Sequence, residues 1–361
     1  MIPARHVDTQ KENEVTKMFK VLGLRGLLAS LLLIGASLPG MAADKVTFGM
    51  IGSSSDAPIY IGLDKGYFAE AGINLVIEPM GSLAKQIAPL SSGALDIGCG
   101  AISAALYNAV SRDIEMKVVA DKGRNAPGYG YNSIIVRKDL VDSGAVKTLA
   151  DLKGRTIATI GVGSVDMSII NEAMKTVGMT YDDIKQTSLP LPSHLIALKN
   201  KGIEVTLTPE PFATLIVDKG LGVRLATVDQ FYPNQQQTVV VYSSKFMKGR
   251  PDVAKRFMVA YLRGVREYMG ALANGTFSGK NADEVIASIR KHTRTKDIGL
   301  LKRIHPAVIN VDGNINFASM KKDWAFLKSK GLIHGATTPE DIVDMSYVEA
   351  AVKKLGPYKK P

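Results

Sequence analysis

Residues 46–58 read Val-Thr-Phe-Gly-Met-Ile-Gly-Ser-Ser-Ser-Asp-Ala-Pro, and this stretch decides the expected fold. The β-branched and aromatic residues at its start predict a short strand, and the glycine, serines and proline that follow predict a turn and a helix start. The helix is expected to begin near Pro58 and to stop at Gly66, and residues 73–77 predict the next strand. Strand and helix patterns keep alternating as far as Ser103, which is typical of a βαβαβ unit.

The first 42 residues contain a segment typical of secretion signals. Basic residues precede an apolar run of about thirteen residues (26–38), and small residues form a cleavage site before Ala43. The run is shorter than the roughly 20 apolar residues that a membrane-spanning helix needs. We therefore expect a leader with signal peptide over residues 1–42, a translation start at Met18, and a mature protein that is soluble in the periplasm.

Composition limits the remaining possibilities. The chain of 361 residues has one cysteine, Cys99, so no intramolecular disulfide can form and the fold depends on its core. The length exceeds what one core usually serves, which favours two lobes. The formal net charge is +11, but the basic residues are scattered over amphipathic helical patterns without interleaved aromatics. This distribution argues against nucleic-acid binding.

Two further β patterns, at residues 133–136 and 238–242, flank a second α/β unit. Residues 121–130 have no periodicity and are expected to form a loop, and the patterns beyond Pro251 are helical. We therefore expect a discontinuous lobe 1 and an inserted lobe 2. The expected boundaries are residues 43–130 and 244–361 for lobe 1 and residues 131–243 for lobe 2.

Two phrases, KGYFAEAGINLVIE (65–78) and LADLKGRTIA (149–158), closely resemble the periplasmic substrate-binding proteins of ABC importers for sulfonates, nitrate, taurine and thiamine precursors. The resemblance extends over nearly all of the chain after the leader. It implies an α/β, two-lobed periplasmic binding protein fold of type II, with lobes joined by two crossover strands. It also implies a monomer without a cofactor that closes around a small solute and delivers it to permease and ATPase subunits at the inner membrane.

The candidate ligand-binding residues lie in loops that follow strands. Ligands of open α/β sheets bind beyond the carboxyl ends of the strands, and helix N-termini offer unpaired N–H groups to anions. Each polar residue in these loops also has a simpler explanation as a helix cap, and Cys99 is expected to be a small packed side chain rather than a nucleophile. The candidates are Ser53, Ser54, Ser55, Gly81, Ser82, Cys99, Gly100, Ser103, Gly163 and Ser164.

Two charged residues complete the candidate set. Residues 208–211 (Thr-Pro-Glu-Pro) resemble the acidic-proline signature of the family, where Glu210 either accepts a hydrogen bond from a ligand amine or neutralises a helix terminus. Arg124 is either the partner of an anionic group or a solvated loop arginine. Tyr129 and Tyr131 either stack on a ligand ring or fill the hinge.

Enzyme motifs do not occur in the sequence. There is no P-loop, GxSxG, GxGxxG or HExxH, and the histidines lack metal-ligand spacing. We therefore expect a binding protein for a small organic anion such as a sulfonate, taurine or a carboxylate. A binding protein for a thiamine-type pyrimidine precursor is the alternative within the fold, and a periplasmic enzyme or sensor module is the alternative of another class.

Overall fold

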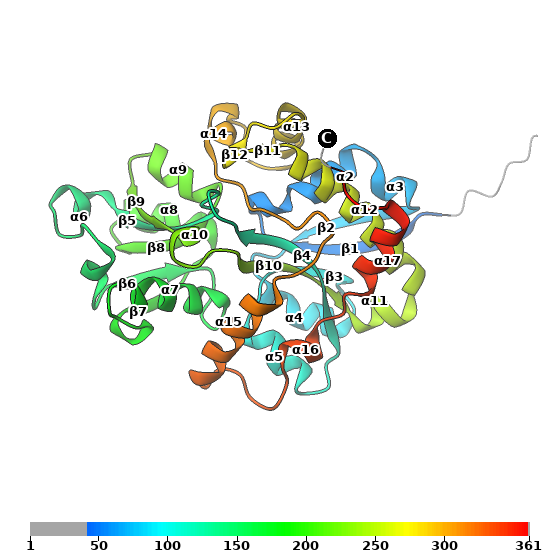
Figure 1. The fold of residues 1–361 in the computed structure, drawn as a ribbon, viewed down its shortest axis with the longest axis horizontal. Coiled ribbons are helices and arrows are strands. Elements are labelled where there is room, and N and C mark those ends of the chain that lie inside the picture. Colours follow the sequence, from blue (N-terminus) through cyan, green and yellow to red (C-terminus); the bar gives the residue numbers. More distant parts are fainter. Residues whose placement is uncertain (1–41, 360–361) are drawn as a thin grey trace, which may run out of the picture. The chain divides into compact units, whose positions relative to one another are not determined.

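The computed structural model describes residues 42–359, so the expected leader and the start at Met18 lie outside the described residues. From Ala43 onward the chain forms one compact unit. Two five-stranded sheets, each with helices packed on it, make up this unit (Figure 1). We call the first sheet with its helices lobe 1 and the second sheet with its helices lobe 2.

The first sheet has the strand order β2-β1-β3-β10-β4. β1 runs parallel to β2 and β3, whereas β10 runs antiparallel to β3 and β4. The parallel part is the βαβαβ unit that residues 46–103 predict. The strands are β1 (Asp44–Met50), β2 (Ile73–Pro79), β3 (Ile97–Ala101), β4 (Met116–Asn125) and β10 (Gln235–Ser243).

The second sheet has the order β7-β6-β8-β5-β9. β6 runs parallel to β7 and β8, and β5 runs antiparallel to β8 and β9. Each sheet therefore combines a parallel unit with an antiparallel strand. The strands are β5 (Asn132–Arg137), β6 (Thr156–Thr159), β7 (Lys185–Ser188), β8 (Val205–Pro209) and β9 (Gly222–Thr227), and a separate hairpin consists of β11 (Leu272–Ala273) and β12 (Thr276–Phe277).

Two details differ from the sequence expectations. Residues 121–125 belong to β4 rather than to a loop, because they pair with β10. The register of this pairing shifts at several residues. Residues 235–243 were expected in lobe 2, but they form β10 inside the first sheet. The chain therefore crosses between the sheets at residues 126–131 and again at residues 232–234.

Helices cover both sheets (Figure 1). Those of seven or more residues are α2 (Ala57–Asp64), α4 (Leu83–Ser92), α5 (Ala104–Val110), α7 (Val165–Lys175), α8 (Leu191–Lys199), α9 (Phe212–Asp218), α12 (Pro251–Gly270), α13 (Ala282–His292), α15 (Phe317–Ser329) and α17 (Ser346–Leu355). The shorter helices are α3 (Tyr67–Glu70), α6 (Lys138–Asp142), α10 (Val228–Phe231), α11 (Ser244–Gly249), α14 (Ile298–Arg303) and α16 (Pro339–Ile342).

The long helix α12 packs tightly against α2 in the core of lobe 1. A Cβ on Gly264 would come within 2.2 Å of the carbonyl oxygen of Pro58, so the two helices approach each other at a position where only glycine fits. Phe257 of α12 stacks on Phe48 and Phe68 in the same core. This close packing fixes the start of α2, and with it the loop that leads into α2.

The two lobes also share a core. Val165 and Met167 of α7 in lobe 2 pack in the same apolar cluster as Ile102 and Val239 of lobe 1. Helix α15, orange in Figure 1, contacts both β10 and α7. The lobes are therefore in direct apolar contact in this structure.

Candidate functional site

The serine-rich loop after β1 is held in place by its own aspartate. Asp56 Oδ2 accepts hydrogen bonds from the backbone N–H groups of Gly52 at 2.7 Å and Ser53 at 3.0 Å. The hydroxyls of Ser53 and Ser55 lie 2.8 Å apart. All three serines of the loop are buried. The loop thus places buried hydroxyls at the carboxyl end of β1, where α/β sheets bind ligands.

A buried lysine of β4 supports the same loop. Lys122 Nζ forms an ion pair with Asp56 and donates a hydrogen bond to Ser55 Oγ at 3.0 Å, and neither charged side chain is exposed to solvent. Burial by itself lowers the pKa of Lys122, but Asp56 raises it and the net shift is upward. Burial also raises the pKa of the neighbouring Cys99 thiol to about 12. The lysine therefore stays charged and paired, and the thiol stays protonated.

Backbone hydrogen bonds join the two lobes along a contact that we call the seam. The seam consists of residues 52–56, 102–104 and 237–238 of lobe 1 and residues 161–166 and 208–211 of lobe 2. The bonds run from Ser54 N to Glu210 O (3.0 Å), from Ala104 N to Gly163 O (2.8 Å) and from Val165 N to Ile102 O (3.0 Å). The loops expected to bind a ligand therefore meet each other across the lobes.

Ser103 and Ser164 occupy facing positions in the seam. They form an isolated antiparallel bridge, and each directly precedes a helix. Ser164 Oγ accepts a hydrogen bond from Asp166 N at 3.3 Å and donates one to the carbonyl oxygen of Gly161 at 2.8 Å. Ser164 therefore caps α7, as its position in the sequence indicates.

Buried polar atoms without a hydrogen-bond partner gather at the seam. Among residues 42–359, eight buried side-chain nitrogen or oxygen atoms have no partner, and five of the eight belong to seam residues. A buried polar group that stays unsatisfied costs about 1–3 kcal/mol, so this concentration indicates atoms that await partners from a bound molecule or from water. The five are Ser54 Oγ, Ser103 Oγ, Thr208 Oγ1, Gln237 Oε1 and Thr238 Oγ1.

The seam is closed in this structure. A cavity that touches both lobes has a volume of about 30 Å³ and is lined by Ser53, Ser54, Tyr60 and Pro211, among other residues. This volume matches the space of about one water molecule. This cavity is too small for an organic solute.

Residues 53–271, more than half of the chain, match the protein family described as NMT1/THI5 like. The chain belongs to this family. The matched range begins in the serine-rich loop and ends just after α12, so it includes every seam residue from Ser53 onward. The family resemblance inferred from the sequence is confirmed.

One curated protein and two solved structures place this NMT1/THI5-like protein among its relatives. It is 28% identical over 151 residues to the 4-amino-5-hydroxymethyl-2-methylpyrimidine phosphate synthase of Aspergillus parasiticus, a match that covers 40% of each chain. The chain thus matches well under half the length of that curated relative. Its structure is similar to that of the alkanesulfonate-binding protein of Xanthomonas axonopodis pv. citri bound to MOPS, with a TM-score of 0.65 and 14% identity over 84% of this chain and 98% of the other.

The periplasmic nitrate-binding protein of Synechocystis PCC 6803 gives a TM-score of 0.68 and 15% identity over 87% of this chain and 89% of the other. At such identities the likeness concerns the fold. The NMT1/THI5-like protein has the two-lobed periplasmic binding protein fold, and the fold class expected from the sequence is confirmed.

Glu210 lies in the seam, but its carboxylate faces lobe 2. Its two oxygens accept hydrogen bonds from the N–H (3.0 Å) and the hydroxyl (2.8 Å) of Thr214 in the first turn of α9. Arg224 of β9 pairs with the same carboxylate at 2.9 Å. Of the two roles that the sequence left open, the observed contacts are those of a helix-terminus partner, and the seam contact of Glu210 is made by its backbone oxygen.

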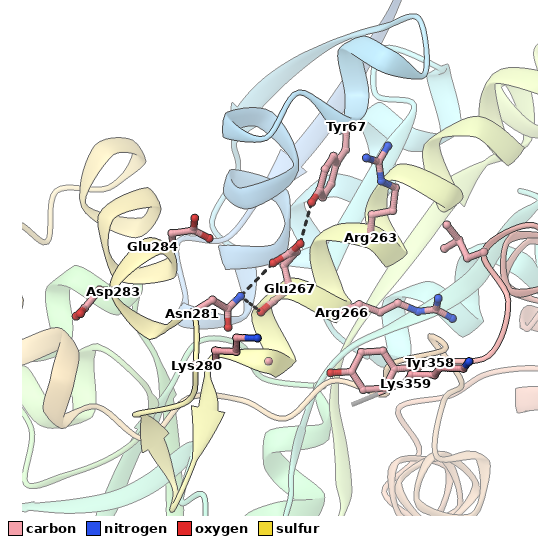
Figure 2. A pocket seen from close by; sticks show the side chains of 12 residues that line it. Tyr67, Arg263, Arg266, Glu267, Lys280, Asn281, Asp283, Glu284, Tyr358 and Lys359 are labelled. Atoms are coloured by element: carbon pink, nitrogen blue, oxygen red, sulfur yellow. Dashed lines mark hydrogen bonds between the residues drawn. The ribbon is translucent and has the colours of Figure 1, made fainter. Parts of the chain in front are cut away.

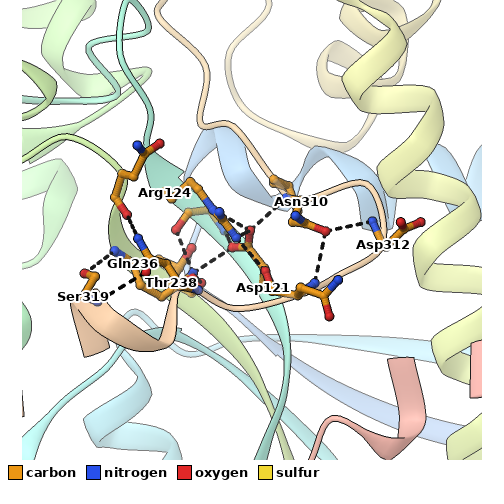
Figure 3. A network of polar contacts seen from close by, with 12 residues as sticks. Asp121, Arg124, Gln236, Thr238, Asn310, Asp312 and Ser319 are labelled. Carbon is orange, nitrogen blue, oxygen red and sulfur yellow. Dashed lines mark hydrogen bonds and ion pairs between the residues drawn. The ribbon is translucent and has the colours of Figure 1, made fainter. Parts of the chain in front are cut away.

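Arg124 lies in a polar network beside the seam, which Figure 3 shows. Its guanidinium group pairs with Asp121 at 2.8 Å and donates a hydrogen bond to the carbonyl oxygen of Asn314. Asp121 also accepts hydrogen bonds from Gln236 Nε2 at 2.7 Å and from Asn310 N at 2.8 Å. Arg124 is thus neither a solvated loop residue nor an unpaired cation in this structure, and the network ties β4 and β10 to the segment before α15.

The other candidates lie at the edge of the seam or beneath it. Gly81 is exposed and Ser82 is partly exposed at the start of α4. Gly100 has a φ of +145°, and a Cβ there would come within 3.0 Å of Leu83 N, so this glycine brings α4 close to β3. The Cys99 side chain is fully buried, and its thiol donates a hydrogen bond to the carbonyl oxygen of Gly49 at 3.1 Å.

Several residues in the seam or beneath it were not among the sequence candidates. Lys122, Gln237 and Thr238 lie inside strands, and Thr208 and Asp166 each lie two residues from a residue that was chosen. The signal that could have identified Lys122 and Gln237 is polarity within an otherwise apolar strand, since a buried polar side chain needs a partner. The partners themselves lie far away in the sequence, since Lys122 pairs with Asp56 and Gln237 with Asp166.

A second cavity, of about 660 Å³, lies on lobe 1 and contains no seam residue (Figure 2). Glu267 lies at its centre and accepts hydrogen bonds from Tyr67 OH at 3.0 Å and Asn281 Nδ2 at 3.1 Å. Arg263 pairs with Glu70, and Arg266 pairs with Asp312. The central charges of this cavity are therefore already paired with one another or with neighbouring residues.

Within residues 42–359, no group of three or more His, Cys, Asp or Glu side chains is arranged to hold a metal ion. In the same part of the chain, no helix combines the length and the apolar character needed to cross a membrane.

Proposed function

We propose that this NMT1/THI5-like protein is the solute-binding component of an ABC importer and that it acts outside the cytoplasm. It binds a small organic solute between its lobes and passes it to permease and ATPase subunits. The protein acts as a monomer and is delivered through the signal segment expected before Ala43. The preferred solute class is a small organic anion or zwitterion, represented by alkanesulfonates, taurine and small carboxylates.

The observation that carries this proposal is the set of five unpartnered polar atoms at the seam. They come from both lobes: Ser54, Ser103, Gln237 and Thr238 from lobe 1, and Thr208 from lobe 2. A solute that touches both sets at once binds the closed arrangement more tightly than the open one. Differential affinity of this kind is what drives hinge closure.

The charges at the seam favour one kind of acid recognition. Lys122 is neutralised by Asp56, and Arg224 is neutralised by Glu210. An acid group would therefore be held by seam hydroxyls such as those of Ser54 and Ser103, which have no partner while the seam is closed. Neutral donors suit a singly charged sulfonate or carboxylate better than a multiply charged phosphate ester.

A pyrimidine precursor of the thiamine type is the second candidate solute. The observation that favours it is the 28% identity with the Aspergillus parasiticus pyrimidine phosphate synthase. Tyr60 lines the small cavity at the seam, with its ring stacked on His292, and Tyr131 is buried. The unpartnered hydroxyls at the seam suit the ring nitrogens and the hydroxymethyl group of such a compound.

Binding without covalent chemistry is part of the proposal. The thiol and the amine near the serine loop belong to Cys99 and Lys122. The pKa of the Cys99 thiol is raised to about 12, and the Lys122 ammonium is paired with Asp56. Both groups are held in their unreactive protonated forms.

Calorimetric titration of the purified protein tests the proposal. The panel contains ethanesulfonate, taurine, short carboxylates and 4-amino-5-hydroxymethyl-2-methylpyrimidine, and small-angle X-ray scattering follows the radius of gyration as each solute is added. We expect saturable binding of at least one compound, accompanied by loss of the open population. The absence of binding by every compound in the panel rejects the proposed solute classes.

A matched pair of serine variants locates the site. Ser54→Ala removes an unpartnered seam hydroxyl, and losing one hydrogen bond of about 1–1.5 kcal/mol weakens binding by about tenfold. Ser143→Ala removes an exposed hydroxyl beyond α6, far along the chain from the seam, and leaves affinity unchanged. Equal affinities of the two variants would place the solute elsewhere.

A further inference from the structure

Asp166 is a buried carboxylate of the seam that no cation neutralises. It lies in the first turn of α7, and only 3% of its surface is exposed. Among the described residues, no Lys, Arg or His side chain lies within ion-pair distance of it. Its side-chain donor is Gln237 Nε2 of β10, at 2.9 Å from Oδ1.

The other buried carboxylates differ from Asp166. Asp56, Asp121 and Glu210 each pair with a lysine or an arginine. Asp323 has no cation, but it accepts hydrogen bonds from Tyr232 OH at 2.9 Å and Gln235 Nε2 at 3.0 Å. Burial raises the pKa of Asp323 to about 7, although hydrogen bonds from Ser168, Gln235 and Tyr232 oppose this rise. Asp323 and Asp166 are thus both buried without a cation, but only Asp166 lies in the seam.

A second acceptor lies beside Asp166. Gln237 uses its Nε2 group to reach Asp166, and its Oε1 atom is buried without a partner. One carboxylate and one amide oxygen therefore occur together where α7 of lobe 2 meets β10 of lobe 1. This end of the seam is rich in acceptors, whereas the serine loop offers the unpartnered hydroxyl of Ser54.

The electrostatics of Asp166 agree with this geometry. Burial raises the pKa of Asp166 to about 6, because the carboxylate loses hydration that the hydrogen bonds from Gln237, Ser164 and the backbone near Ile160 only partly replace. None of these three groups is charged. A cationic or strongly donating nitrogen placed here would gain from a carboxylate that water no longer screens.

We propose that Asp166 and Gln237 Oε1 form the acceptor end of the solute site and that the solute carries an amino group that binds there. This inference rests on the proposed function and makes it more specific. It selects solutes with both an amino group and an acidic or hydroxyl group, such as taurine or an aminopyrimidine, over analogues that lack only the amino group. It also assigns to Asp166 the amine-binding role that was one of the two alternatives for Glu210.

Two pairs of probes test the inference, because the members of each pair differ only in the amino group. Taurine is compared with ethanesulfonate, and 4-amino-5-hydroxymethyl-2-methylpyrimidine with 5-hydroxymethyl-2-methylpyrimidine, by calorimetry at a pH above the pKa of Asp166. We expect the wild-type protein to bind the amino member of one pair at least about tenfold more tightly. Asp166→Asn, which keeps the shape of the side chain, should abolish that preference.

Asp323→Asn is the matched control, since Asp323 is equally buried and equally without a cation but lies outside the seam. It should keep the preference of the wild-type protein. If Asp166→Asn does not fold, Asp166→Ser serves in its place, because serine is well suited to the first turn of a helix.

The outcomes separate the inference from the function on which it rests. Equal binding of both members of a pair by the wild-type protein, or an unchanged preference in the Asp166 variant, overturns the inference and leaves solute binding intact. Failure of all four probes to bind overturns the proposed function and the inference together. Loss of the preference in both the Asp166 and the Asp323 variants also overturns it, because the effect would then come from a general change in the fold.

Discussion

Replacing Lys122 by methionine removes the buried ammonium group that pairs with Asp56 beneath the serine loop. The side chain of Asp56 then remains buried without a cation, although its Oδ2 atom keeps the backbone N–H groups of Gly52 and Ser53. Breaking a buried ion pair from one side costs about 3–5 kcal/mol. Because the two N–H groups remain, we expect a loss near the lower limit, about 3 kcal/mol in the free energy of unfolding.

The expected change in melting temperature follows from the size of the protein. Unfolding entropy is about 2.1 cal/mol/K per residue near the melting temperature. For the 318 residues that the structure describes, a loss of about 3 kcal/mol lowers the melting temperature by about 4–5 °C. Urea unfolding and calorimetric melting measure the two quantities independently.

The double variant Lys122→Met/Asp56→Asn provides the control. It removes the buried negative charge as well, so it should be less destabilised than the two single variants together, with a coupling energy of about 1–3 kcal/mol. A Lys122→Met protein that loses less than about 1 kcal/mol, or single-variant losses that simply add, would refute the reasoning that this pair holds the serine loop.

Three further changes have expected outcomes. Burial raises the pKa of Asp323 to about 7, compared with about 3.9 in the unfolded chain. The stability that Asp323 contributes is therefore lost as pH rises between these two values. Asp323→Asn should flatten this part of the profile of unfolding free energy against pH, measured with urea. Cys99 should not react with a thiol reagent in the native protein and should react once urea unfolds it, since its thiol is fully buried; rapid native labelling would contradict this. Gly264→Ala should lower the free energy of unfolding by about 1–3 kcal/mol, because the added Cβ would lie 2.2 Å from the Pro58 oxygen. Gly249 has open space around it, so the melting temperature of Gly249→Ala should lie within about 1 °C of the wild type.

Several helices and strands could be predicted from local sequence patterns. Residues 46–51 predict β1, Pro58 predicts the start of α2, and Ser164 predicts the cap of α7, as observed. These features depend on contacts within a few residues, so alternation, turn residues and capping residues are sufficient to predict them.

The extent of β4 could not be predicted in this way. Residues 121–125 are polar and carry a glycine, so local propensity favours a loop, but pairing with β10 makes them a strand. The polar side chains of this strand find partners far along the chain: Lys122 binds Asp56, and Asp121 binds Gln236. Tertiary contacts override local preference here because a buried backbone must form hydrogen bonds.

The candidate site, too, could be predicted only in part from the sequence. The sequence identified the loops of the seam, since serine and glycine at strand ends mark helix starts and ligand sites alike. The sequence could not show which carboxylate of the seam lacks a cation. Glu210 accepts a hydrogen bond from α9 and pairs with Arg224, whereas Asp166 accepts a hydrogen bond from Gln237.

By itself, therefore, the sequence determined the family, the two-lobed fold and the loops at which a solute is expected. Only the tertiary structure decided which charges neutralise one another and which polar atoms are left to bind a solute. The physical reason is that helix and strand patterns arise from neighbours in the chain, whereas the pairing of buried charges depends on distances between residues that only the packed fold brings together.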